Sequence, residues 1–460
     1  MKALVRIIPG VITLLSTASW ALDVRDLQGE KLTTFHSPGG VEERCVVPQK
    51  WIPEKFSEDD RKIEAKLCGK DFYSIGICPK YNSSNPGVLL LDPKGSATAQ
   101  IITNSNCSEE VIDELDVKVD AKFKQSLSCS YTPSVLAYYQ ISRLFDGAGR
   151  VPVSVIRTMD IATHRALTDK ANRALRGSRD LIAQTWKMFA AVHENPGKYN
   201  AIVDDSRKHI YGAIAQNVKG EYIYTEVNGR GDYDSRYQRF QKQPPFLKVA
   251  SSSGLIELAG GSSFQKIAPV AVQMKDVSDM VLLDTLLNQT DRIGNIAFKF
   301  VWYYQDKAQS PTWVSVKSKA EVKKIDGVAK TIVPPAEIKE FQQGKNAVLV
   351  REMYLKDNDC GVAKDNNMRI NSVIEKVRHM SYVTYTRFMQ MAKKMPLAET
   401  RAYFKRELLF TDKDFDSVSK NFQFAKDLLY RNCKSGFLKF DIDLADYVSG
   451  SGPSSKSCDI

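Results

Sequence analysis

The 460-residue sequence lacks the patterns that mark several large protein classes. Beyond its first residues it has no apolar run of about 20 residues, which excludes a polytopic membrane protein. It has no self-similar period, which excludes solenoids and coiled coils. It has no His-Glu-x-x-His, no Gly-x-Ser-x-Gly and no complete P-loop, which argues against zinc hydrolases, nucleophile-elbow hydrolases and Walker-type ATPases. With 43% apolar residues, the chain can still build a sizeable core.

The eight cysteines form no Cys-x-x-Cys pair, so the spacing of zinc ribbons and thioredoxin-type sites is also missing. Five of them lie at or before Cys129, and three lie at or after Cys360. Because both numbers are odd, complete pairing requires at least one disulfide between the N-terminal and the C-terminal parts of the chain. The spacing alone selects no particular set of pairs.

Residues 1–21 are predicted to be a signal peptide that is removed on export. Lys2 and Arg6 form a positive start, residues 7–15 are mostly apolar, and Ser19-Trp20-Ala21 supplies small residues where a signal peptidase cuts. We therefore expect a periplasmic or secreted protein, in a compartment that favours disulfides.

The chain carries a net charge of +11, which falls to +9 when Lys2 and Arg6 are removed. A positive protein attracts acidic partners. The basic residues form no recognisable nucleic-acid module, so no nucleic-acid partner is expected. The mature chain is expected to have no transmembrane helix and to act on a secreted protein or a glycan, including acidic ones.

Short β-type segments precede a mainly helical region. Strands are expected at 87–91, 99–102 and 117–123, and Thr132-Pro133 predicts the start of a helix. This order predicts an α+β fold of two lobes, with a small β-rich N-lobe and a larger, mainly helical C-lobe. The expected division is a disulfide-tied segment at 22–85, an N-lobe at 86–160, a C-lobe at 161–448 with an insertion near 307–343, and a flexible tail at 449–460.

Three polar stretches lie where these elements end, at residues 121–125, 284–295 and 354–361. Phosphoryl transfer from ATP needs a lysine for the phosphates, a carboxylate that accepts the proton of the attacking hydroxyl, and oxygen ligands for divalent metals. Lys124, Asp291, Asn295 and Asp357 supply these groups in that order. Each alone has an ordinary explanation, because strand-end lysines are mostly solvated and Asp and Asn often form caps and turns.

These stretches resemble the atypical secretory-pathway kinases, the Golgi casein kinase and four-jointed group, with this chain as a divergent bacterial-type member. Residues 134–157 are similar to that family's αC-equivalent helix and its R-x-P-P-x-x-x-R strand. Residues 284–292 are similar to its D-x-L-x-x-N-x-D-R-H segment. The resemblance implies a protein-kinase-like fold, with ATP and Mg or Mn as cofactors.

By this resemblance Lys124 is the lysine that contacts the ATP phosphates, Asp291 is the catalytic base, and Asp357 is the metal-binding residue of the family's D-x-G-x-G motif. Asn295 and Asp359 are the further candidates for metal ligands, because Mg and Mn prefer such oxygen donors.

The turn at residues 94–97 is expected to cover the phosphates with backbone N–H groups of Gly95 and Ser96. An ordinary hairpin loop is the alternative interpretation of these residues.

The sequence departs from the family pattern at several positions, which are Val153, Gln289, Ile293, Asp359 and Val135. The most important departure is Val135, which occupies the place of the helix glutamate that pairs with the lysine. Glu109, Glu110 or Glu114 could supply that carboxylate instead.

Two functions therefore follow from the sequence. The favoured one is an exported, ATP-dependent kinase that phosphorylates a hydroxyl on a secreted protein or glycan. The alternative is a catalytically impaired pseudokinase, or a partner-binding module, on the same scaffold.

Overall fold

The computed structural model describes residues 22–83, 85–305, 314–319, 321–325, 328–333, 347–448, 453 and 455–460. The predicted signal peptide, much of the insertion predicted at 307–343 and part of the predicted tail lie outside the described residues.

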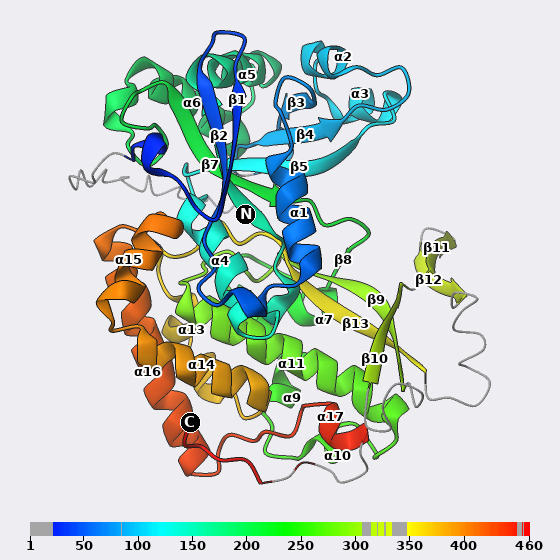
Figure 1. Cartoon of the computed structure of the whole chain (residues 1–460). Coiled ribbons are helices and arrows are strands. Elements are labelled where there is room, and N and C mark those ends of the chain that lie inside the picture. Colours follow the sequence, from blue (N-terminus) through cyan, green and yellow to red (C-terminus); the bar gives the residue numbers. More distant parts are fainter. Residues whose placement is uncertain are drawn as a thin grey trace, which may run out of the picture.

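The smaller lobe is built on one antiparallel sheet of seven strands, in the order β1-β2-β6-β7-β5-β4-β3. The strands are β1 (Lys31–His36), β2 (Glu42–Val47), β3 (Gly76–Pro79), β4 (Val88–Asp92), β5 (Lys118–Gln125), β6 (Ser154–Asp160) and β7 (His209–Gln216). The sheet forms the upper half of the molecule in Figure 1. Strands β1, β2 and β3 of this sheet come before the 86–160 range that was predicted for the N-lobe, and β7 comes after it.

Helices cover this sheet and connect it to the other lobe. They are α1 (Glu58–Cys68), α2 (Ala99–Asn104), α3 (Glu109–Glu114), α4 (Thr132–Leu144), α5 (Ile161–Ala174) and α6 (Leu181–Glu194). The helix predicted from Thr132-Pro133 is confirmed as α4, and nearly all of its residues are buried. It contacts β6 and β7 on one side and the large lobe on the other.

The strand predicted at residues 99–102 is wrong, because these residues form helix α2. The Thr98 hydroxyl accepts a hydrogen bond from the backbone N–H of Ile101 at 3.2 Å. Such a side-chain cap satisfies a free N–H group of the first helical turn. This local cap outweighs the β-type composition of a short segment.

The larger lobe is organised around α11 (Phe264–Leu286), a 23-residue helix that is buried over most of its length. The other helices of this lobe are α7 (Thr225–Asn228), α8 (Arg236–Phe240), α9 (Pro244–Val249), α10 (Leu255–Leu258), α13 (Asn367–Ile370), α14 (Tyr382–Lys394), α15 (Ala398–Glu407), α16 (Asp412–Lys434) and α17 (Ala445–Val448). Single 3₁₀ turns occur at η1 (Val24–Asp26), η2 (Pro53–Lys55), η3 (Ala148–Arg150), η4 (Pro196–Lys198) and η5 (Ile374–Lys376). One continuous apolar core joins residues of α4, α11, α14 and α16, so it runs through both lobes.

A second sheet lies beside α11 and leads into the region between the lobes. Its strands are β8 (Tyr222–Ile223), β9 (Ile296–Gln305), β10 (Val314–Lys319) and β13 (Val348–Leu355), and a separate hairpin is formed by β11 (Glu321–Ile325) and β12 (Val328–Val333). The expected α+β class is therefore confirmed, with a small sheet-based lobe and a larger, mainly helical one (Figure 1).

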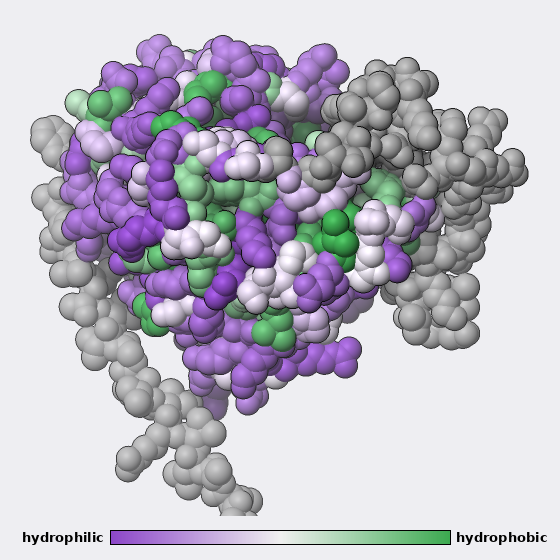
Figure 2. All heavy atoms as spheres, turned by 90° about the horizontal axis from the view of Figure 1, so that it is seen from below, coloured by the Kyte–Doolittle hydropathy of each residue, from purple (hydrophilic) through white to green (hydrophobic). Residues whose placement is uncertain are grey.

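The surface of the large lobe is mostly hydrophilic when it is seen from below, and its hydrophobic residues form small separate spots (Figure 2). Among the described helices, none has both the length and the apolar character that crossing a bilayer requires.

All eight cysteines are paired, in the disulfides Cys45–Cys68, Cys78–Cys107, Cys129–Cys360 and Cys433–Cys458. The disulfide expected between the N-terminal and C-terminal parts is confirmed as Cys129–Cys360, which spans 231 residues of sequence. It joins the segment between β5 and α4 to the segment after β13.

Replacing both Cys129 and Cys360 by serine should lower the free energy of unfolding by up to about 5 kcal/mol, because the unfolded chain loses a very long closed loop. The matched control replaces Cys433 and Cys458, whose separation is only 25 residues, and should cost about 3 kcal/mol. Chemical denaturation of the oxidised proteins measures both values. A smaller loss in the first variant than in the control would contradict this ranking.

Candidate active site

Lys124 lies at the end of β5, on the face of the strand that points away from the core of the small lobe. Ala121, Phe123 and Gln125 are buried, while Lys122 and Lys124 alternate with them, as strand geometry requires. The Lys124 Nζ lies 3.2 Å from Asp359 Oδ1 and 3.4 Å from Asp357 Oδ1. Burial opposes the charge on Lys124, but the two carboxylates outweigh it and raise the pKa of this amine.

Asp357 and Asp359 lie just after the end of β13, and Asn358 between them points the other way. The Asn358 amide donates to the carbonyl of Leu355 at 2.6 Å, and its Oδ1 accepts from Arg292 Nη2 at 2.6 Å. The Ser134 hydroxyl of α4 donates to the backbone carbonyl of Asn358 at 2.6 Å. These bonds fix the segment so that the two carboxylates face Lys124.

The loop that carries Asp291 follows α11 and is held by a buried ion pair. Arg292 and Asp284 are fully buried, and Arg292 Nε lies 2.9 Å from Asp284 Oδ2. The Tyr138 hydroxyl of α4 donates to Asp284 Oδ1 at 2.6 Å. The Gln289 amide donates to the carbonyl of Asp357 at 3.1 Å, which connects this loop to the β13 corner. The loop and the corner are therefore parts of one hydrogen-bonded network.

The Asp291 carboxylate is held on both of its oxygens. Its Oδ1 accepts from Arg236 Nη1 at 3.1 Å and from the Tyr233 hydroxyl at 3.4 Å, and its Oδ2 accepts from Asn295 Nδ2 at 3.1 Å. Burial raises the pKa of Asp291, and the nearby Arg236 only partly offsets this effect. Such a carboxylate can accept a proton from a hydroxyl that reaches Oδ1.

These side chains line a cavity of about 240 Å³ between the lobes. Lys80, Lys122 and Lys124 contribute three amines, and the lining also includes Asn82, Ser83, Asn85, Gly87, Asp291, Asn295, Asp357 and Asp359. Burial and the charges of Lys124 and Lys122 lower the pKa of Lys80 to about 8. Burial raises the pKa of Asp357, but the lysines reverse this effect and hold it well below its usual range. The cavity thus has a cationic wall and an anionic wall.

Of the residues predicted for the site, Lys124, Asp291, Asn295, Asp357 and Asp359 all line this one cavity. Lys80 and Lys122 were missed, although Lys122 could have been found because it lies two residues before Lys124 on the same face of the strand.

Gly95 and Ser96 do not line the cavity, so the prediction of a phosphate-covering turn at residues 94–97 is not supported. Val88 pairs with Phe123 at the site end of the sheet, whereas Asp92 pairs with Lys118 at the other end. Gly95 lies three residues beyond Asp92, so the length of β4 separates this turn from the site. The segment that does line the cavity is the β3–β4 loop, with Asn82, Ser83, Asn85 and Gly87.

Val135 is buried in α4, with 6% of its surface exposed, and gives Lys124 no carboxylate. Glu109, Glu110 and Glu114 lie on the exposed surface of α3, outside the cavity lining, and the Glu109 carboxylate accepts a hydrogen bond from Asn82. None of these three residues therefore supplies the carboxylate beside Lys124 in this structure. The large lobe supplies the partner of Lys124 instead, and Asp359, whose side chain is only 4% exposed, is the nearer carboxylate.

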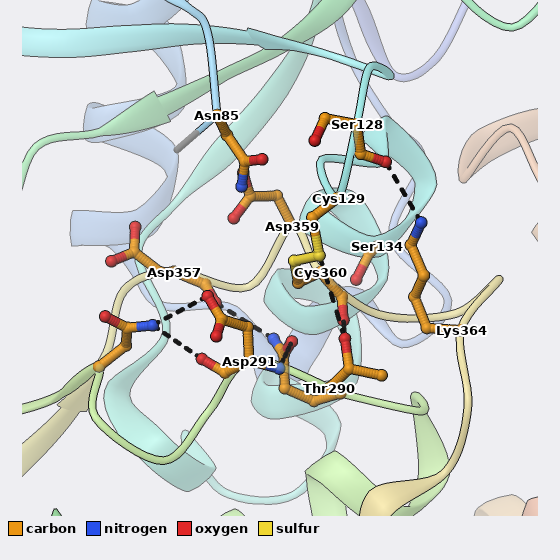
Figure 3. The surroundings of a disulfide bond; sticks show 12 residues. Asn85, Ser128, Cys129, Ser134, Thr290, Asp291, Asp357, Asp359, Cys360 and Lys364 are labelled. Atoms are coloured by element: carbon orange, nitrogen blue, oxygen red, sulfur yellow. Dashed lines mark hydrogen bonds between the residues drawn. A yellow bond between two sulfur atoms is a disulfide. The ribbon is translucent and has the colours of Figure 1, made fainter. Parts of the chain in front are cut away.

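The Cys129–Cys360 disulfide lies at the edge of the site, beside Asp359, Asp291 and Thr290 (Figure 3). Cys360 follows Asp359 directly, and its carbonyl accepts from the backbone N–H of Thr290 at 3.0 Å. The backbone N–H of Tyr131 donates to the carbonyl of Asp359 at 2.8 Å. The start of α4, the Asp291 loop and the β13 corner therefore meet at this disulfide.

The oxygen donors of the cavity suit a metal ion that takes its remaining ligands from a bound substrate. Among the described residues, no group of three or more His, Cys, Asp or Glu side chains could hold a metal ion. Asp357 and Asp359 provide two carboxylates, and Asn295 adds an amide in the same cavity. Mg²⁺ in phosphoryl-transfer sites is typically held by one or two carboxylates together with substrate phosphates, so these residues match that pattern.

A lysine at a strand end of the smaller lobe thus faces the acidic strand end of the larger lobe. No family model matches the chain, and no curated protein matches it. A crystal structure of the Golgi casein kinase with Mn/ADP bound is similar, with a TM-score of 0.41 and 10% sequence identity, over 81% of this chain and 76% of that one. A likeness of this size supports no assignment of activity by itself.

Replacing Arg292 by methionine should lower the free energy of unfolding by about 3–5 kcal/mol, because it leaves the buried carboxylate of Asp284 without its partner. The matched control is Arg401→Met, which breaks the exposed pairs with Asp412 and Asp416 and should cost no more than about 1 kcal/mol. Denaturant unfolding measures both. Equal losses in the two variants would show that the buried pair does not hold the Asp291 loop.

Proposed function

We propose that this protein is an ATP-dependent phosphotransferase that acts on a hydroxyl group of an exported protein or glycan. The observation that carries the proposal is the convergence of Lys124 from the small lobe with Asp357 and Asp359 from the large lobe, at 3.4 and 3.2 Å. Asp291, the proposed base, lines the same cavity. A cation for phosphates, acidic metal ligands and a base are the parts that phosphoryl transfer requires.

The cationic wall is suited to a polyphosphate. Lys124, with Lys80 and Lys122 beside it, would contact the phosphate oxygens. Asp357, Asp359 and Asn295 would hold Mg²⁺ or Mn²⁺, which supplies neutralising charge on the transferred group.

Asp291 would act as the general base. Its Oδ2 is held by Asn295, while Oδ1 faces the Tyr233 hydroxyl and Arg236. A hydroxyl of the acceptor that reaches Oδ1 can give up its proton there as it attacks the phosphorus. Arg236 keeps this carboxylate oriented and holds positive charge close to the reacting group.

The proposed acceptor class follows from the predicted export of the chain. A signal peptide at residues 1–21 would take the protein out of the cytosol, and four disulfides are typical of oxidising compartments. The acceptor would then be a secreted protein or a glycan. The excess of positive charge favours an acidic one.

A second candidate is a pseudokinase or partner-binding module. It is favoured by Val135, which removes the helix glutamate, and by the contacts of Lys124, which already neutralise both carboxylates that a metal would need. In that case the charge pair would be a structural bridge between the lobes. Binding of ATP with Mn²⁺ separates the two candidates, because a ligand that binds the native state raises the melting temperature.

Replacing Asp291 by asparagine should lower the rate of phosphoryl transfer by about 10²–10⁴-fold, because the general base is lost, while binding of ATP with Mn²⁺ persists. Asp357→Ala should abolish the Mn²⁺-dependent thermal shift as well as transfer. Radiolabelled ATP, dephosphorylated casein and the cell-envelope extract of the source organism provide the transfer assay. Asp427→Asn, at an exposed position on α16, is the matched control. Undiminished transfer by the Asp291 variant would refute the assigned base.

The lysine cluster should make nucleotide binding depend on pH. The pKa of Lys80 lies at about 8, so below that pH the amine is charged and attracts phosphate, and above it the charge is lost. A bound anion favours the charged form, so ATP binding near pH 8 should take up protons. Lys80→Met should abolish much of this uptake and weaken binding by about tenfold below pH 8.

Titration calorimetry in two buffers of different ionisation enthalpy measures the proton uptake. Lys62→Met, at an exposed position on α1, is the control and should behave as the wild type. If the Lys80 variant takes up as many protons as the wild type, Lys80 does not contact the phosphates.

A further inference from the structure

The hydroxyl of Tyr233 donates a hydrogen bond to the proposed base. It lies 3.4 Å from Asp291 Oδ1, which also accepts from Arg236 Nη1 at 3.1 Å. Within the described part of the chain, no other hydroxyl donates a hydrogen bond to this carboxylate. We propose that Tyr233 is an intramolecular phosphoryl acceptor of this site, so that the protein phosphorylates itself there; this inference rests on the proposed function.

The backbone around Tyr233 is suited to presenting a side chain at the site. Residues 229–235 connect α7 to α8, and Gly229 and Gly231 have positive φ angles of 71° and 135°, which glycine adopts at low cost. The residue Tyr233 is 65% exposed. It is therefore a side chain at the rim of the site and not part of the core.

Contacts from α8 hold this loop beside the Asp291 loop. The guanidinium of Arg236 lies 3.6 Å from the centre of the Tyr233 ring and also contacts Asp291. The Tyr237 hydroxyl donates to the carbonyl of Gln289 at 3.2 Å. Arg239 Nη1 donates to the carbonyl of Asp232 at 2.5 Å. The approach of Tyr233 to Asp291 is thus fixed from several sides.

The chemistry of the step balances with ATP as the only co-reactant. The phenolic oxygen of Tyr233 forms a bond to the γ-phosphorus, and the bond from that phosphorus to the β–γ bridging oxygen breaks, which releases ADP. The phenolic proton passes to Asp291 Oδ1 and from there to solvent. The product is a phosphate ester on Tyr233.

The charge of the product would act on both Asp291 and Arg236. A phosphotyrosine carries close to two negative charges at neutral pH, and it would lie beside Asp291, which repels it. Arg236, whose guanidinium lies 3.6 Å from the centre of the Tyr233 ring and 3.1 Å from Asp291, would attract it. The new phosphate would therefore compete with Asp291 for Arg236.

The test incubates the full mature chain with radiolabelled ATP and Mn²⁺, and maps the phosphate by peptide mass spectrometry. We expect label on the peptide that contains Tyr233, at a rate per molecule that does not change when the protein is diluted tenfold. Tyr233→Phe should lose this label, while its melting temperature should still rise with ATP and Mn²⁺ because the binding residues are unchanged. Tyr430→Phe is the matched control, because Tyr430 also donates to a carboxylate, Asp459, at 3.0 Å, and it should keep the label.

The outcomes separate this inference from the proposed function. Transfer to casein without label on Tyr233 would overturn the inference and leave the proposed function standing. Label on Tyr233 whose rate per molecule rises with protein concentration would also overturn it, because transfer would then occur between molecules. A chain that neither gains thermal stability from ATP and Mn²⁺ nor transfers phosphate would overturn the proposed function, and the inference with it.

Discussion

The charge pair between the two lobes is the interaction on which the site depends. The amine of Lys124 comes from a strand of the small lobe, and the carboxylates of Asp357 and Asp359 come from the end of a strand in the large lobe. A charge that is largely removed from water is stable only beside a partner. Neither lobe could therefore bury its own side of the cavity without the other. The buried Arg292–Asp284 pair serves this interaction by fixing the corner that carries the carboxylates.

The carboxylate partner of Lys124 comes from a different element than the family pattern predicts. The helix position expected to carry a glutamate holds Val135, which packs in the core. The carboxylate comes instead from the Asp357-Asn358-Asp359 corner. In an extended segment alternate residues point the same way, so both aspartates face Lys124 while Asn358 turns toward Arg292. The alternation of aspartate and asparagine is visible in the sequence, whereas the distance between these aspartates and β5 is not.

The sequence predicted the parts of the site that depend on local signals. Lys124 at a strand end, Asp291 after a long helix and Asp357 after an apolar strand were chosen from such local signals together with the family resemblance, and the structure brings all three to one cavity. The loop over the cavity was misplaced because residues 99–102 have β-type composition, whereas the Thr98 cap makes them helical. The full sheet could not be predicted, since pairs such as β2 with β6 and β5 with β7 join segments far apart in the chain.

The Cys129–Cys360 disulfide makes this corner of the site sensitive to the redox state of its compartment. It lies where the start of α4 contacts the carbonyl of Asp359 and the Asp291 loop contacts the carbonyl of Cys360. The cytosol keeps thiols reduced, so a reduced chain would hold its acidic corner by hydrogen bonds and by the ion pairs with Lys124. On the export route proposed above, the covalent link would form only after translocation. The redox state of the compartment would thus act on the same corner that carries Asp357 and Asp359.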